Sequence, residues 1–159
     1  KTAYEICVCD WSSDVCSSDL TLEADYAVRI VHCLAKNGQR MDAKSISDET
    51  GVTLRFSLKI LRKLVSAGII KSYKGTQGGY EIARPLEEIT LNDVIETVEG
   101  PFALSRCLRQ DYDCGQNCCG DRDCNCVFRG IYGEISEEVK EKLTAVKFSD
   151  LVKHGETPQ

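Results

Sequence analysis

Six of the ten cysteines in this 159-residue chain lie within one 20-residue segment. They are Cys107, Cys114, Cys118, Cys119, Cys124 and Cys126. Such a cluster either forms disulfides in a secreted protein or binds a metal through thiolates in a reducing compartment. The rest of the chain has long helical patterns and no secretory signal, whereas small disulfide scaffolds rarely need such helices. We therefore expect a metal site in a cytoplasmic protein.

The spacing of these cysteines leaves two kinds of metal centre open. Cys114 with Cys118, and Cys119 with Cys124, form close pairs of the kind that bind structural zinc. The wider gaps around Cys107 suit an iron–sulfur cluster, whose ligands surround a larger object. Spacing alone favours neither. Because the segment also carries four aspartates, we expect metal binding to order it.

The elements that would position this segment are mainly helical. Apolar residues recur at helical spacing over residues 24–36 and 43–50, and Gly38 and Gly51 follow as helix ends. A third helix is predicted from Thr53, as its N-cap, to residue 67. Three helices with a short glycine-containing turn between the second and third resemble a helix-turn-helix.

The third predicted helix has two different faces. Its buried stripe is predicted to consist of Leu54, Leu58, Leu61 and Val65. Another face carries Arg55, Lys59 and Arg62. Residues 53–74 contain basic side chains and no acidic ones, although the net charge of the chain is −5. This local basic stretch indicates contact with nucleic acid; the alternative is a solvated helix face.

Two short β-type segments, residues 69–73 and 80–83, follow the third helix and are predicted to form a hairpin. The glycine-rich loop between them permits positive φ angles and close approach to a phosphate backbone. It is not a nucleotide-binding loop, because no helix follows the glycines directly and no Gly-Lys-Ser/Thr motif is present.

Two further helices are predicted beyond the hairpin. Thr90 caps the first, which runs to Val98, and Gly100-Pro101 ends it. The second follows the cysteines, where apolar residues from Phe128 to Val146 repeat at spacings of three and four. A stripe this long predicts a helix that pairs with its copy in a homodimer; the alternative is packing on the first helix. No apolar run approaches the ~18 residues that span a membrane, so no membrane association is expected.

These elements define the predicted fold class: mainly α with a small β-hairpin wing, arranged as a winged helix-turn-helix plus a long C-terminal dimerisation helix. Residues 1–20 have no apolar period and look like the translation of a sequencing-adapter oligonucleotide. We expect that segment to be non-native and exclude its three cysteines, Cys7, Cys9 and Cys16, from the metal site.

The sequence resembles the IscR/NsrR-type family of iron–sulfur winged-helix transcription regulators. The resemblance lies in residues 24–29, residues 51–70, the wing Lys74-Gly75-x-x-Gly78-Gly79-Tyr80, residues 90–95, Arg106-Cys107, and the gapless run from Cys126 to Val152. It implies a bacterial homodimer that binds double-stranded operator DNA, without catalysis. A 2Fe-2S or 4Fe-4S cluster would control binding and sense nitric oxide, redox stress or cluster supply.

The resemblance also implies the cluster ligands. Cys107, Cys114 and Cys126 match the three cysteines of the family, and Cys118, Cys119 or Cys124 could replace Cys114. The fourth ligand varies among relatives. Arg129 stands where some have a histidine, whereas Asp25 matches an aspartate that others supply from the partner subunit. Asp25 could equally be a helix N-terminal charge favoured by the dipole, and the extra cysteines offer an all-thiolate alternative.

With the basic face of the third helix, the resemblance predicts DNA contacts at Thr53, Arg55, Phe56, Lys59, Arg62, Lys74, Gly75 and Gln77. Residues 21–100 would form the DNA-binding domain and residues 101–127 the cluster-binding loop. Residues 128–152 would form the dimerisation helix and C-terminal packing segment, followed by a tail, 153–159.

Two other functions remain open. One is a regulator of the same fold without a cluster, controlled by cysteine thiol oxidation or a partner protein. The other is a zinc-stabilised interaction module without a DNA role. An enzyme is not expected, because the sequence shows no nucleophile–base pair, no paired catalytic carboxylates and no cofactor loop. Cys33 is predicted to be a core residue.

Overall fold

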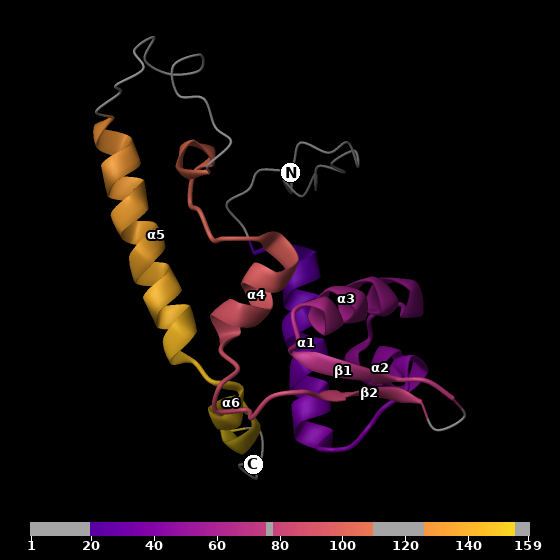
Figure 1. The fold of residues 1–159 in the computed structure, drawn as a ribbon. Helices are drawn as coiled ribbons and strands as arrows, with labels where there is room; N and C mark the ends of the chain where they lie inside the picture. Colours follow the sequence, from indigo (N-terminus) through magenta and orange to yellow (C-terminus); the bar gives the residue numbers. More distant parts are fainter. Residues whose placement is uncertain (1–19, 76–77, 110–125, 155–159) are drawn as a thin grey trace, which may run out of the picture.

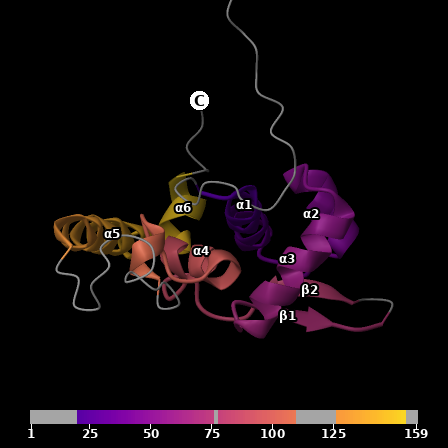
Figure 2. The same cartoon turned by 90° about the horizontal axis from the view of Figure 1, so that it is seen from above.

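A computed structural model describes residues 20–75, 78–109 and 126–154 of the chain. The first part contains three helices and a hairpin: α1 (Leu22–Asn37), α2 (Ala43–Thr50), α3 (Leu54–Ser66), β1 (Ile70–Tyr73) and β2 (Gly79–Ile82). The second part contains α4 (Leu91–Glu99), the short 3-10 helix η1 (Arg106–Leu108), α5 (Val127–Ala145) and α6 (Phe148–His154). The hairpin projects on one side of the molecule and α5 lies on the opposite side (Figures 1 and 2). The predicted fold class, a winged helix-turn-helix, is confirmed.

Side-chain caps explain where the helices begin. The hydroxyl of Thr21 accepts a hydrogen bond from the Ala24 amide at the start of α1, and Asp42 caps α2 in the same way. Thr90 and Asp93 form a reciprocal capping box at the start of α4. Gly38 ends α1 in the left-handed conformation, with φ 61°. These boundaries agree with the sequence prediction to within a few residues.

The two strands of the wing pair antiparallel, with Ile70 opposite Ile82 and Tyr73 opposite Gly79. The turn between α1 and α2 extends this sheet, because Met41 and Tyr80 exchange backbone hydrogen bonds of 3.0 and 2.8 Å. Gly79 is needed for that contact. A Cβ at this position would lie 2.6 Å from the Met41 carbonyl oxygen. The described structure therefore requires this glycine for backbone packing, whereas the sequence argument invoked access to phosphate.

The predicted buried stripe of α3 is wrong in its orientation. Of its four residues only Leu61 is buried, and Leu54 is 43% exposed. The face that packs consists of Ser57, Ile60, Leu61 and Leu64. Ser57 can lie in the core because its hydroxyl donates a hydrogen bond to the Val52 carbonyl at 3.3 Å. The buried face is therefore rotated from the predicted stripe, and its first residue is polar.

The end of the chain returns to the core. Phe148, the first residue of α6, is fully buried in the same cluster as Ile30 and Leu34 of α1. Its amide donates to the Ile89 carbonyl at 3.0 Å, which ties α6 to the segment before α4. The long helix α5 packs on α4 and η1, whereas α6 packs on α1. Within the described ranges, no helix combines the length and the apolar character needed to cross a membrane.

Candidate DNA-binding surface and metal site

The outward face of α3 carries the predicted basic residues. Arg55, Lys59 and Arg62 are exposed, and they line one surface groove together with Thr53, Leu54, Phe56 and Leu58. The opposite side of the helix is packed on the core, so the fold leaves this face at the surface. One face packs and the other is free to meet DNA, which is the arrangement that a recognition helix requires.

Two of the predicted DNA-binding residues also have structural contacts. Phe56 is half-buried and meets the ring of Tyr26 edge-on, with 5.6 Å between ring centroids. It therefore helps to hold α3 against α1. Thr53 is the N-cap of α3 by position, but its side chain makes no capping hydrogen bond. Its exposed hydroxyl is left for other partners.

The wing presents a second basic position. Lys74 and Gly75 are exposed at the start of the hairpin loop, and Gly75 has φ +102°. Gln77 lies outside the described residues. At the loop end of β1, the guanidinium of Arg40 stacks on the ring of Tyr73, and both residues contact Glu81. The hydrogen bond to Glu81 raises the pKa of Tyr73, and the same contact lowers the pKa of Glu81.

The described ligand candidates come from three elements. Cys107 lies in η1, where its thiol donates to the Ser105 hydroxyl at 3.3 Å, and Cys126 is the N-cap residue of α5. Both cysteines are half-buried. The segment that contains η1 and the start of α5 both lie at the end of the molecule away from α6 (Figure 1). Asp25 lies in the first turn of α1 and forms an ion pair of 2.8 Å with Arg29.

The described part of the chain contains no group of three histidine, cysteine or acidic side chains that could hold a metal ion. Four of the candidate ligands, Cys114, Cys118, Cys119 and Cys124, lie outside it. Thiols are suitable donors for either iron or zinc. Cys107 and Cys126, the first and last cysteines of the cluster in sequence, therefore fit a thiolate site. This donor set supports both metal alternatives equally.

Cys33 is a core residue, as predicted. Its side chain is 8% exposed and contacts Met41 and Glu49. Burial, followed by the hydrogen bond and negative charge of Glu49, raises the pKa of the Cys33 thiol to about 11. A protonated, buried thiol is a poor nucleophile and a poor metal ligand, so Cys33 serves as an internal comparison for the cysteines of the candidate site.

Sequence reasoning missed two residues that organise this surface. Arg40 precedes α2 yet contacts the wing, and Glu23 in α1 forms ion pairs with Lys59 and Lys63 of α3. Glu23 is 36 residues from Lys59 along the chain. No periodicity or local motif reports a contact at that separation, so only the tertiary structure could reveal either residue.

Comparisons with known proteins agree with this architecture. The chain is 30% identical over 136 residues to protein rrf2 of Nitratidesulfovibrio vulgaris, covering 84% of this chain and 87% of the relative. The fold resembles that of T. potens IscR, with a TM-score of 0.67, 23% identity, and coverage of 89% of this chain and 93% of that one. It also resembles CymR, the global cysteine regulator of B. subtilis, with a TM-score of 0.66, 24% identity, and coverage of 86% and 97%.

The family model described as "Rrf2: Iron-dependent Transcriptional regulator" matches residues 20–154, which is most of the chain. The two structural likenesses are below 25% identity and show the fold only, whereas the family match covers the wing, the third helix and the long helix together. The family resemblance predicted from the sequence is thereby confirmed, as is the expectation that the protein is not an enzyme. The chain belongs to the Rrf2 family of transcriptional regulators.

Proposed function

We propose that this DNA-binding regulator is a cytoplasmic repressor that acts as a homodimer and whose operator affinity is controlled by an iron–sulfur cluster. Cys107, Cys126 and one cysteine of the segment between them, with Cys114 as first choice, would be its ligands. Asp25 of the partner subunit would be the fourth. The cluster would be 2Fe-2S or 4Fe-4S, and its iron and sulfide would supply the reactivity toward nitric oxide or oxidants.

The observation that carries this proposal is the position of the two half-buried thiols. Cys107 follows α4 closely, and Cys126 begins α5, which packs on α4. α4 in turn packs on α3, the helix with the basic outward face. A metal held between Cys107 and Cys126 would thus restrain two elements that contact each other and, through α4, the recognition helix.

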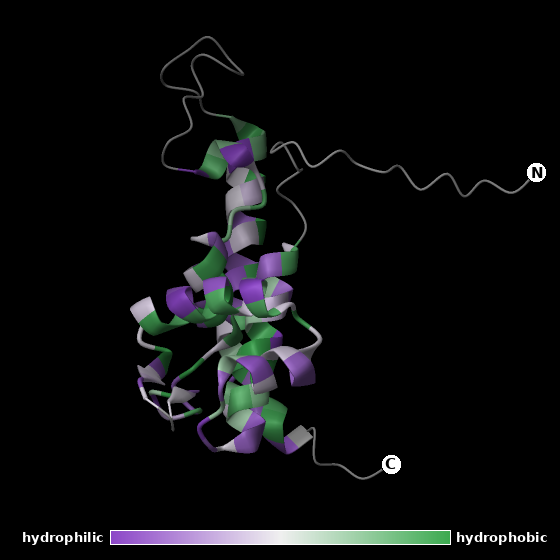
Figure 3. Ribbon diagram, turned by 90° about the vertical axis from the view of Figure 1, so that its right-hand side faces the viewer, coloured by the Kyte–Doolittle hydropathy of each residue, from purple (hydrophilic) through white to green (hydrophobic). Residues whose placement is uncertain are grey.

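The dimer part of the proposal rests on the exposed apolar side chains of α5. Val127 is 73% exposed, Phe128 65%, Ile131 45% and Ile135 40%, and Phe128 stacks on Tyr132. All four belong to the N-terminal half of α5, and that end of the helix extends beyond the packed body (Figures 1 and 3). An apolar stripe on a long helix is typical of a surface that pairs with its copy.

The cluster is tested by purifying the full chain without oxygen and measuring visible absorption, iron and acid-labile sulfide. We expect a coloured protein with matching iron and sulfide, both lost in Cys126→Ser. Cys33→Ala is the matched control, because Cys33 is buried in the core away from the proposed ligands, and it should keep the cluster. Retained iron in Cys126→Ser would refute its role as a ligand.

Two alternatives are outcomes of the same measurement. A colourless protein that contains zinc favours the zinc-stabilised module. A protein without metal after cluster reconstitution favours control by thiol oxidation or a partner protein. Control by thiol oxidation or a partner protein is supported by the fold likeness to CymR, which is described as the global cysteine regulator of B. subtilis.

The DNA surface is tested separately. Arg55→Gln and Lys74→Gln should each weaken binding to a selected operator duplex by about 1–3 kcal/mol if the side chain reads a base. Unchanged affinity in both variants would refute the placement of α3 and the wing on DNA. This measurement does not depend on which metal the protein contains.

A further inference from the structure

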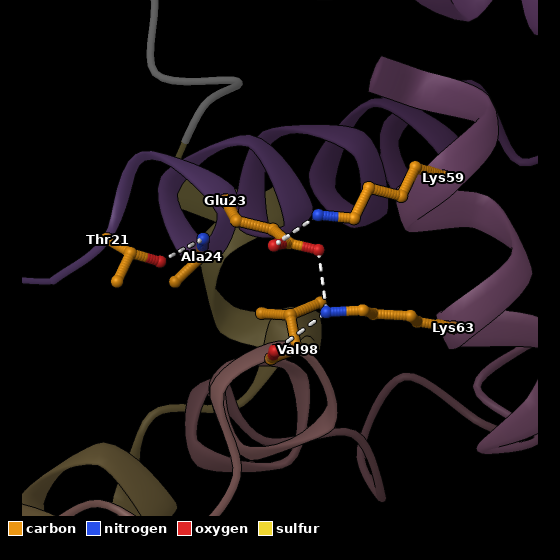
Figure 4. A network of polar contacts seen from close by, with 6 residues as sticks. All are labelled: Thr21, Glu23, Ala24, Lys59, Lys63 and Val98. Carbon is orange, nitrogen blue, oxygen red and sulfur yellow. Dashed lines mark hydrogen bonds and ion pairs between the residues drawn. The ribbon is translucent and has the colours of Figure 1, made fainter. Parts of the chain in front are cut away.

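The carboxylate of Glu23, in the first turn of α1, lies between two lysines of α3 (Figure 4). Glu23 Oε2 is 3.0 Å from Lys59 Nζ, and Glu23 Oε1 is 2.7 Å from Lys63 Nζ. The Glu23 side chain is only 18% exposed. One acidic residue distant in the sequence therefore compensates two cations of residues 53–74, a stretch that contains no acidic side chain of its own.

The two lysines have different surroundings. Lys63 Nζ also donates a hydrogen bond to the Val98 carbonyl at 2.9 Å, so Lys63 joins α1, α3 and the end of α4 (Figure 4). The Lys59 side chain is 56% exposed and belongs to the outward face of α3, with Arg55 and Arg62. Within the described residues, neither arginine has an ion-pair partner. Of the three cations on this face, only Lys59 is held by a carboxylate.

Glu23 remains charged under the conditions in which DNA binds. Burial raises its pKa, but hydrogen bonds from Lys63 and Lys59 and their positive charges outweigh that effect and lower the pKa below its ordinary value. The negative charge next to Lys59 is thus a permanent part of the surface near neutral pH.

We propose that Glu23 lowers the sequence-independent part of the DNA affinity, because it withholds the Lys59 ammonium from the phosphate backbone. This inference rests on the proposal that the outward face of α3 meets DNA. Attraction between cations and phosphates is the same for every DNA sequence, whereas contacts with base edges differ between sequences. Compensating one cation therefore weakens the attraction to every duplex by a similar factor and leaves discrimination between sequences to contacts with base edges.

The test is Glu23→Gln in the full chain, which keeps the size of the side chain and removes its charge. Binding is measured over a range of salt concentrations on two duplexes, one selected by the wild-type protein from a random pool and one with the same bases scrambled. The plot of log affinity against log salt should steepen by about 0.9 on both duplexes, as expected for one additional phosphate contact. Both affinities should rise by a similar factor, so the affinity ratio between selected and scrambled DNA should stay near its wild-type value.

Three further substitutions, one of them also combined with Glu23→Gln, separate this effect from a general change of charge. Glu87→Gln removes an exposed carboxylate between β2 and α4 and should leave the slope unchanged. Lys59→Gln should change the slope little in the wild type, and should reverse the steepening when combined with Glu23→Gln. Arg62→Gln, in contrast, should flatten the slope by about 0.9.

An unchanged slope in folded Glu23→Gln overturns the inference, as does a Lys59→Gln effect equal to that of Arg62→Gln. Thermal unfolding checks that each variant is folded, and if Glu23→Gln does not fold, the comparison of Lys59→Gln with Arg62→Gln decides. A wild-type protein that binds neither duplex refutes the placement of α3 on DNA as well. A wild-type protein that binds with an unchanged Glu23→Gln slope refutes only the role of Glu23.

Discussion

The guanidinium of Arg40 lies 3.6 Å from the centre of the Tyr73 ring, so a residue of the turn before α2 is stacked on the wing. Arg40 also forms an ion pair of 3.4 Å with Glu81 on the opposite strand. The loop end of β1 is therefore held by a residue outside the hairpin. A two-stranded ribbon is marginally stable by itself, so this contact from outside the hairpin stabilises the wing.

Arg40→Ala should weaken operator binding several-fold while leaving the fold intact, because the wing loses its stacking partner and its ion pair. The operator affinity of Arg40→Lys should lie between those of the wild type and Arg40→Ala, because lysine keeps the charge but lacks the planar group that stacks. Operator affinity and thermal unfolding together check this prediction. Equal affinity of all three proteins would show that the wing needs no such support.

Gly79→Ala should lower the free energy of unfolding by about 3 kcal/mol. Backbone strain at φ +153° and the overlap of Cβ with the Met41 carbonyl each cost roughly 1–3 kcal/mol. Gly38→Ala is the matched control, because its φ is +61° and nothing lies within 4 Å of the added Cβ. We expect that variant to lose only about 1 kcal/mol in urea denaturation. Equal losses would contradict the proposed overlap.

Substitutions in α3 test which of its faces is buried. Ser57→Leu should destabilise the protein by about 1–3 kcal/mol through overpacking. Ser57→Ala should cost about 1 kcal/mol or less, because the Val52 carbonyl keeps its hydrogen bond from the Ser47 hydroxyl. Leu54→Ala, at an exposed position, should change stability by no more than about 0.5 kcal/mol. A large loss of stability in Leu54→Ala would show that Leu54 is buried, as the sequence predicted.

Ile131→Glu should convert the protein to monomers without unfolding it, because Ile131 is exposed on the apolar face of α5. Sedimentation or light scattering gives the mass, and circular dichroism the fold. Thr144→Glu adds the same charge at an exposed position near the other end of α5 and should leave the mass unchanged. A wild-type protein that is already monomeric would refute the proposed dimer.

The ion pairs of Glu23 should make stability depend on pH. Its pKa is lowered in the folded protein from an ordinary value of 4.5, so its stabilising contribution is complete above that value and is lost as the pH falls through the folded pKa. The stability difference between the wild type and Glu23→Gln should therefore be constant near neutral pH and shrink below about pH 4.5. Urea denaturation at several pH values measures it, and a difference that grows on acidification would contradict the assignment.

Much of the architecture follows from local sequence. Capping residues such as Thr21, Asp42 and Thr90, and Gly38 as a terminator, mark the helix ends, because backbone groups at those ends need partners within a few residues. The glycine-rich hairpin was predicted in the same way. The resemblance to a family of winged-helix regulators also came from residue patterns, and the family match confirms it.

The faces and partners of these elements were decided only in three dimensions. Periodicity places residues on a helix, but which sector is buried depends on the neighbouring elements, and in α3 that sector includes Ser57. Among the charged side chains of residues 53–74, all are basic. Glu23 nevertheless compensates Lys59 and Lys63, because electrostatic interactions act through space rather than along the chain. Likewise, α5 packs on α4 and α6 packs on α1. These pairings depend on contacts between residues distant in the sequence, which a local pattern does not predict.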